Sequence, residues 1–191
     1  MAQDIKKLIA QEYIKCAKDP AYFMKKYCYI QHPTRGRILF NLYPFQEKVL
    51  HLFRDHQYII TLKSRQLGIS TLAAAYSLWL MTFHKDKNVL ALATTQATAR
   101  NLVTKVIFMY DQLPKWLRLP AKEKNKLSLR LVNGSRVQAK SSSPDAARSE
   151  AVSLLLMDEA AFIENVDETF TAAQQTLATG GQCMALSTPN G

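Results

Sequence analysis

The chain has 191 residues, of which 48% are hydrophobic and 21% charged, a composition typical of a globular protein with one hydrophobic core. Its apolar runs fall well short of the roughly 20 residues that a membrane-spanning helix needs, and its N-terminus is too frequently charged for a signal peptide. The three cysteines include no C-x-x-C pair, so neither a disulfide framework nor a zinc site is indicated. We expect one domain, a reducing cytoplasm and no membrane partner.

The net charge is +10, and the excess of basic residues lies in two segments. Residues 1–40 hold eight Lys and Arg against three acids, and residues 114–140 hold eight against one. A basic surface attracts polyanions, so nucleic acid is a candidate partner. Charge alone leaves open the alternative of a surface that only keeps the protein in solution.

The first part of the chain predicts a small helical lobe. Apolar residues recur at helical spacing through residues 1–32 and predict two short helices, interrupted at Asp19 and Pro20. The turn-prone residues 32–37 follow and separate this lobe from the rest. We therefore expect a lobe at residues 1–40 and a core at residues 41–191.

Beyond about residue 40, the pattern alternates strands and helices, which is typical of a parallel α/β sheet. Strands are predicted at 57–62, 88–94, 152–157 and 182–187, and helices at 70–82, 96–113 and 166–178. The strands read as continuous apolar runs, so we expect both faces of the sheet to be covered. Within residues 127–140, Asn133 and Gly134 predict a hairpin.

Residues 57–82 predict a strand, a tight loop and a helix in that order. Such a loop binds anions, because unpaired amide groups and the helix dipole converge on it. The common pattern G-x-x-x-x-G-K-[ST] is matched by Gly68 and Ser70, whereas Lys63 replaces the first glycine and Ile69 replaces the lysine. An ordinary strand-turn-helix with one glycine in its turn is the alternative interpretation.

Asp158 and Glu159 end an apolar strand, where ionised carboxylates are costly unless a cation balances them. A Mg²⁺ ion carrying phosphates would balance them, with one acid holding the metal and the other orienting or deprotonating an attacking water. The alternative is that both acids cap the helix that follows. Together with the loop upstream, the pair favours a nucleotide site.

Five segments, in this order and spacing, resemble the ATPase domain of the large terminase subunit, the DNA-packaging motor of tailed bacteriophages: YPFQEKVL, KSRQLGIST, LATTQATARNL, NGSRVQAKSSSPDAARSEAVSLLLMDEAAFI and STPNG. The resemblance covers residues 40–191. It implies a P-loop NTPase core with a RecA-like parallel sheet flanked by helices, in which the final strand lies between the loop-bearing strand and the strand of Asp158. We expect the nuclease domain that follows in full-length members to be absent.

The resemblance also implies ATP and Mg²⁺ as cofactors. Asp158 and Ser70 would hold the metal, and Glu159 would activate water. The residues expected to contact the nucleotide are Tyr43, Pro44 and Gln46 at the adenine, the loop residues Lys63, Ser64, Arg65, Gln66, Leu67, Gly68, Ile69, Ser70 and Thr71, and Ser187 and Thr188 at the γ-phosphate.

Three basic residues are expected to act on the phosphates. Lys63, at the start of the loop, is predicted to replace the lysine missing at position 69, because a flexible ammonium can reach the same phosphates from the other side. Arg65 would assist it. Arg148 resembles a residue that reaches the ATP of a neighbouring subunit, and a surface salt bridge to Glu150 or Asp145 is its alternative.

The function that the resemblance implies is ATP hydrolysis that moves double-stranded DNA into a procapsid. The expected partners are double-stranded DNA, the portal protein, the small terminase subunit and further copies of the chain in a ring, in the cytoplasm of the infected bacterial host. Three alternatives stay open: a DEAD-box-like helicase lobe, a nucleotide-binding module in which Ile69 marks lost catalysis, and an interaction protein whose basic faces dock on the portal or the small subunit.

Overall fold

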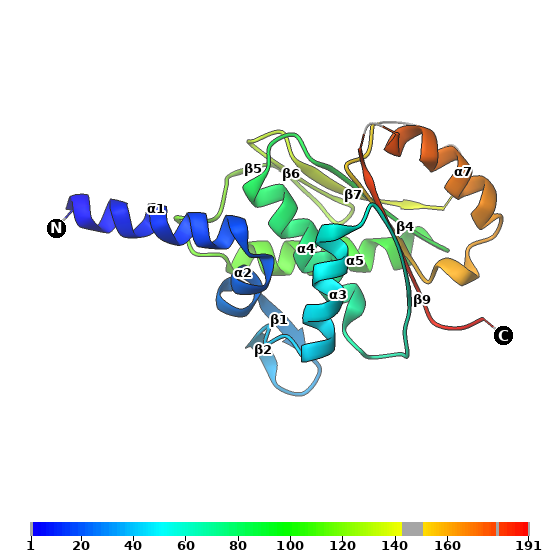
Figure 1. The fold of residues 1–191 in the computed structure, drawn as a ribbon, viewed down its shortest axis with the longest axis horizontal. Helices are drawn as coiled ribbons and strands as arrows, with labels where there is room; N and C mark the ends of the chain where they lie inside the picture. Colours follow the sequence, from blue (N-terminus) through cyan, green and yellow to red (C-terminus); the bar gives the residue numbers. More distant parts are fainter. Residues whose placement is uncertain (1, 143–150, 179, 191) are drawn as a thin grey trace.

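A computed structural model describes residues 2–142, 151–178 and 180–190 (Figure 1). The N-terminal part contains α1 (Ala2–Lys18), α2 (Pro20–Tyr27) and an antiparallel pair of short strands, β1 (Tyr29–His32) and β2 (Gly36–Leu39). The predicted break between the helices is confirmed. Asp19 caps α2 by accepting hydrogen bonds from the amides of Ala21 and Tyr22, and Pro20 occupies the first helical position.

The N-terminal helices pack on the rest of the chain through the main hydrophobic core. The Trp79 indole donates a hydrogen bond of 2.9 Å to the Cys16 carbonyl, and Phe23 is fully buried in that core. Glu12 joins α1 to α2, because its carboxylate accepts hydrogen bonds from Tyr22, Lys26 and Tyr27. The division at residue 40 stays a prediction.

The rest of the chain forms one sheet with helices on both faces. Its elements in chain order are α3 (Pro44–Asp55), β3 (Tyr58–Leu62), α4 (Ile69–Phe83), β4 (Asn88–Ala93), α5 (Gln96–Gln112), β5 (Ala121–Lys124), β6 (Ser128–Leu131), β7 (Arg136–Ser141), β8 (Leu154–Asp158), the 3-10 turn η1 (Ala160–Phe162), α7 (Val166–Leu177) and β9 (Gln182–Ser187). The strand order is β3-β9-β8-β4-β7-β6-β5. The pairs from β3 to β7 are parallel, and β6 and β5 continue the sheet antiparallel.

This topology confirms the predicted RecA-like class, including the position of the final strand β9 between β3 and β8. Helices α4 and α5 pack into the main core on one face, while α7 packs into a second core on the other (Figure 1). Helix α4 is buried along nearly its whole length, which explains why its sequence is apolar on all sides. In the described part of the chain, no helix is long and apolar enough to cross a membrane.

The expectation that both faces of every strand are covered is wrong for β3. Tyr58, Ile60 and Leu62 are 48%, 87% and 72% exposed. Strand β3 ends the sheet, and α7 packs mainly over its neighbours, while Phe170 of α7 meets the ring of Tyr58 on β3. A strand's place at the edge or in the middle follows from topology, so its apolar composition could not reveal it.

Candidate functional site

The loop at residues 63–68, between β3 and α4, has an unusual backbone. Gln66 and Gly68 adopt left-handed conformations, with φ of 63° and 72°. A Cβ atom at Gly68 would lie 2.8 Å from Gln46 Nε2, so the position requires glycine for space as well as for its backbone angles. Since α4 begins at Ile69, the amide groups of its first turn lack helical acceptors and are available to an anion.

Gln46 anchors this loop from α3. Its side chain is 2% exposed, accepts a hydrogen bond from the Tyr43 amide at 3.0 Å and donates one to the Leu67 carbonyl at 2.9 Å. Tyr43 is 62% exposed and its ring stacks on Phe45. The geometry therefore gives Gln46 a role in positioning the loop, and the predicted contacts of Tyr43, Pro44 and Gln46 with a base stay a prediction.

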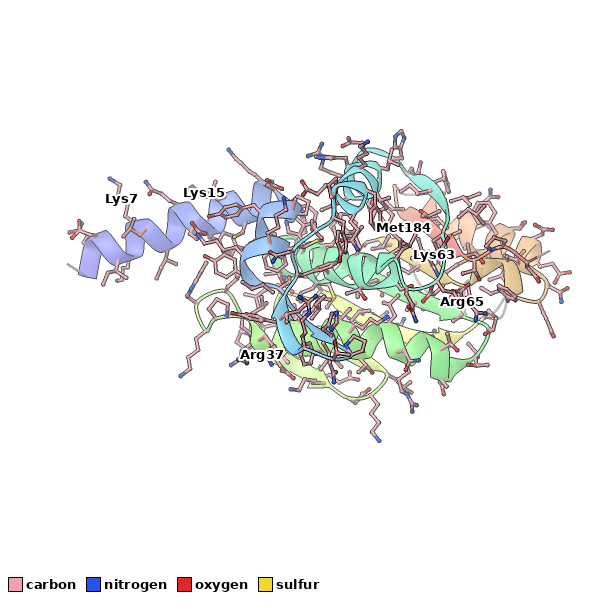
Figure 2. All side chains as sticks on the ribbon, turned by 90° about the horizontal axis from the view of Figure 1, so that it is seen from below. Lys7, Lys15, Arg37, Lys63, Arg65 and Met184 are labelled. Atoms are coloured by element: carbon pink, nitrogen blue, oxygen red, sulfur yellow. The ribbon has the colours of Figure 1, made fainter. Side chains whose placement is uncertain are left out.

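The residue at position 69 cannot supply a positive charge to the loop, and Lys63 is the cation that lies there instead. Ile69 is 3% exposed and packs in the main hydrophobic core, so its side chain does not serve the loop. Lys63 is the cation at the site: its ammonium lies 2.7 Å from Glu159 Oε1 and 3.8 Å from Asp158 Oδ1. Its side chain is only 8% exposed. Figure 2 shows Lys63 and Arg65 close together, on the side of the molecule away from α1.

The two acids at the end of β8, Asp158 and Glu159, accept hydrogen bonds from residues elsewhere in the sequence. Asp158 Oδ1 accepts a hydrogen bond of 3.0 Å from the Ser70 hydroxyl. Glu159 Oε2 accepts from the Thr188 amide at 3.0 Å and from the Thr188 hydroxyl at 2.9 Å. Since the Glu159 side chain makes no capping hydrogen bond to η1, the capping interpretation does not account for it.

Glu159 is held in a strained conformation with its charge stabilised. Its φ of 54° lies in the left-handed region, which costs roughly 1–3 kcal/mol for a residue with a side chain. Burial raises the pKa of Glu159, but the hydrogen bonds from Lys63 and Thr188 outweigh it, and the pKa lies below its usual value. The carboxylate is therefore ionised at neutral pH.

The end of β9 links the start of the loop to the turn that follows Glu159. Ser187 Oγ accepts a hydrogen bond from the Ala161 amide and donates one to the Thr188 carbonyl. The Ser187 carbonyl in turn accepts a backbone hydrogen bond from Lys63 at 2.9 Å. The structure thus brings together Lys63, Ser70, Asp158, Glu159 and Thr188 at the carboxyl edge of the sheet, and their roles at a nucleotide stay a prediction.

Other predicted residues lie outside this cluster. Ser64 and Arg65 are exposed, and Arg65 has no hydrogen bond or ion pair with any residue that the structure describes. Arg148, with Asp145 and Glu150, belongs to residues 143–150, which are not among the described residues. Sequence analysis gave no role to Lys105, a lone charge in the apolar run VTKVIFMY of α5.

The sequence matches one protein-family model over most of its length. The family model described as "Terminase large subunit, T4likevirus-type, N-terminal" matches residues 60–191, well over half of the chain. The chain belongs to this family. The terminase resemblance seen in the sequence is thereby confirmed.

Solved terminase structures share the fold of this terminase chain. The large terminase ATPase domain of Thermus phage P74-26 is 21% identical with a TM-score of 0.64, and the match covers 79% of this chain and 66% of that one. The bacteriophage HK97 large terminase is 17% identical with a TM-score of 0.70, covering 90% and 37%. The large terminase of a thermophilic bacteriophage, in complex with ADP, is 17% identical with a TM-score of 0.60, covering 77% and 39%. The chain thus spans about two thirds of the first structure and well under half of the others.

Proposed function

We propose that this terminase-family chain binds and hydrolyses ATP, and that this drives the packaging of double-stranded DNA. The strongest support for the proposal is a cluster of contacts beside the first turn of α4: Lys63 pairs with Asp158 and Glu159, and Ser70 donates a hydrogen bond to Asp158. Structures of the large terminase from the thermophilic bacteriophage were obtained with ADP and with ATP-gamma-S. An anion-binding loop, a cation and two carboxylates are what phosphoryl transfer to water requires.

The phosphates would lie against the loop and the first turn of α4. The amide groups of that turn have no helical acceptor, and Lys63 enters from the opposite end of the loop. Arg65 is exposed beside them and would add a second positive charge. In this proposal the Lys63 ammonium exchanges Glu159 for a phosphate oxygen when the nucleotide binds.

Asp158 and Ser70 suit a Mg²⁺ ion. Their oxygen atoms lie 3.0 Å apart, and Mg²⁺ bound to nucleotides typically takes one or two protein oxygens, with phosphates and waters completing its shell. Among the described residues no three His, Cys, Asp or Glu side chains gather around a point, so the phosphates would have to supply part of the metal's shell. When bound, the metal would neutralise charge on the phosphates.

Glu159 is the proposed base. In the structure Lys63 occupies one carboxylate oxygen, while Thr188 holds the other through two hydrogen bonds. Once Lys63 turns to a phosphate, that first oxygen becomes available to orient and deprotonate a water. Loss of the Lys63 hydrogen bond also lets the pKa of Glu159 rise, which makes the carboxylate a better base.

The partners in packaging belong to the same proposal. They are double-stranded DNA, the portal protein, the small terminase subunit and further copies of the chain in a ring, in the cytoplasm of the infected host. Strand β5 and the loop after it support a DNA contact, because Lys122, Lys124 and Lys126 are exposed there. Arg148 is proposed to act on a neighbouring subunit's ATP.

The test is ATP binding and phosphate release by the purified chain with Mg²⁺. Glu159→Gln should retain ATP binding and lose turnover, since the amide keeps the shape and an acceptor for Thr188 but is no base. Glu164→Gln, which removes an exposed carboxylate five residues later, is the matched control and should leave turnover unchanged.

Three outcomes would contradict the proposal in different ways. Full turnover by Glu159→Gln would show that another group activates the water. ATP binding by the wild-type chain without turnover, even with its packaging partners present, would indicate a module that has lost catalysis. Absence of ATP binding would favour an interaction protein.

A further inference from the structure

A cavity of about 370 Å³ opens between β1, α4 and α5. Its apolar wall includes Ile30, Phe108 and Met109, and its polar groups include Thr71, Thr104 and Lys105. A predominantly apolar cavity with a few polar groups, at the lower end of the usual size range, is typical of small-ligand sites. Thr71 directly follows Ser70 in the first turn of α4, so the cavity begins where the phosphate loop ends.

Lys105 is the basic side chain that α5 contributes to this cavity. It is partly buried, and within the described part of the chain its ammonium forms no hydrogen bond or ion pair. Burial lowers the pKa of Lys105, and the charges that act on it are those of the phosphate site, Asp158 and Lys63. A partly buried ammonium without a partner is costly, and an anion in the cavity would remove that cost.

Two of the polar residues in the cavity, one on each helix, indicate what it can hold. Lys105 on α5 and Thr71 on α4 line the same space, and the unpaired amides of the first turn of α4 lie beside Thr71. An anionic group in the cavity would lie beside both the ammonium of Lys105 and the hydroxyl of Thr71. Lys63 lies at the opposite end of the loop, beside Asp158 and Glu159.

We propose that Lys105 is a second phosphate-binding lysine, which reaches the phosphates of a nucleoside triphosphate from α5 through this cavity. The inference rests on the proposed function and adds a residue that does not belong to the loop. Lys63 approaches the phosphates from the end of β3, and Lys105 approaches them from α5. Lys63 and Lys105 would then together bind the phosphates in place of a lysine at position 69.

The experiment is calorimetric titration of the full chain with ATP and, separately, with inorganic tripolyphosphate. Losing a hydrogen bond to a charged group should weaken both ligands about 10- to 100-fold in Lys105→Gln. Lys105→Arg should restore most of the affinity. Lys85→Gln, in the exposed loop at the other edge of the sheet, removes the same charge and should bind like the wild type.

Each result decides the inference. Wild-type affinity for both ligands in Lys105→Gln would overturn it, and so would weakened ATP with unchanged tripolyphosphate, which would place Lys105 on the nucleoside. Should Lys105→Gln melt well below the wild type by circular dichroism, the apolar Lys105→Met variant takes its place in the same titrations. If the wild-type chain binds neither ligand, the proposed function itself fails. This outcome is separate from the test of Lys105, because it is measured on the wild type and not on a variant.

Discussion

The Lys63 ion pair is expected to stabilise the nucleotide-free chain, and Lys63→Met tests this. The ammonium lies 2.7 Å from Glu159 and 3.8 Å from Asp158, and its removal leaves two neighbouring carboxylates without an opposing charge. Breaking a buried pair costs about 3–5 kcal/mol. Glu159 is 32% exposed and keeps both hydrogen bonds from Thr188, so we expect a loss of about 2 kcal/mol.

A double-mutant cycle separates the pair from other effects of the substitution. Urea unfolding at pH 7, followed by circular dichroism, would be measured for the wild type, Lys63→Met, Glu159→Gln and the double variant. The loss in Lys63→Met should be smaller when Glu159 is already neutral, with a coupling of about 1–2 kcal/mol. A coupling below about 0.3 kcal/mol would refute the ion pair, because independent sites are additive within that limit.

The pH dependence gives a second check of the same pair. Because the folded-state pKa of Glu159 lies below 4.5, its contribution to stability is present above pH 4.5 and is lost as the pH falls through the lowered value. Lys63→Met removes the hydrogen bond that lowers the pKa of Glu159 most, while burial still raises it, so the pKa of Glu159 should rise. The slope of stability with pH should therefore differ between wild type and variant in acid, and equal slopes would contradict the assignment.

Three further predictions concern the loop and the N-terminal helices. Gly68→Ala should lower the melting temperature more than Gly36→Ala. Backbone φ is positive at both positions, but only at position 68 would the new Cβ meet Gln46 Nε2, so equal losses would argue against a tight loop. Gln46→Leu should cost about 1–3 kcal/mol in urea unfolding, since it leaves a loop carbonyl and an amide without partners, and an unchanged midpoint would remove its anchoring role. The hydrogen bond from Lys26, with those from two tyrosines, lowers the pKa of Glu12 to about 2, so the stability that ionised Glu12 provides should persist above pH 4.5 and fade toward pH 2. Thermal melts of Glu12→Gln should show a flatter profile over that range, and parallel profiles would contradict the cluster.

Local structure was largely predictable from the sequence. The helix break at Asp19 and Pro20, the helix after Gly68 and the hairpin at Asn133 and Gly134 all depend on neighbouring residues, through caps, turns and hydrophobic spacing. Asp158 and Glu159 were predicted as site residues because charges at the end of an apolar strand need a compensating partner. Lys63 was predicted at the site because the pattern had a lysine missing at position 69 and one in excess at the loop's start.

Other features depend on which strands become neighbours, and they appear only in the folded chain. The ion pair between Lys63 and Glu159 joins residues 96 positions apart, because parallel strands bring their carboxyl ends to one edge of the sheet. The exposure of Ile60 follows from the place of β3 at the end of the strand order. Gln46 reaches the loop, and Lys105 shares a cavity with Thr71, through the packing of helices. Local chemistry thus determines the elements and indicates most of the candidate site residues, whereas sheet order and helix packing determine which of them meet, because those contacts join distant parts of the chain.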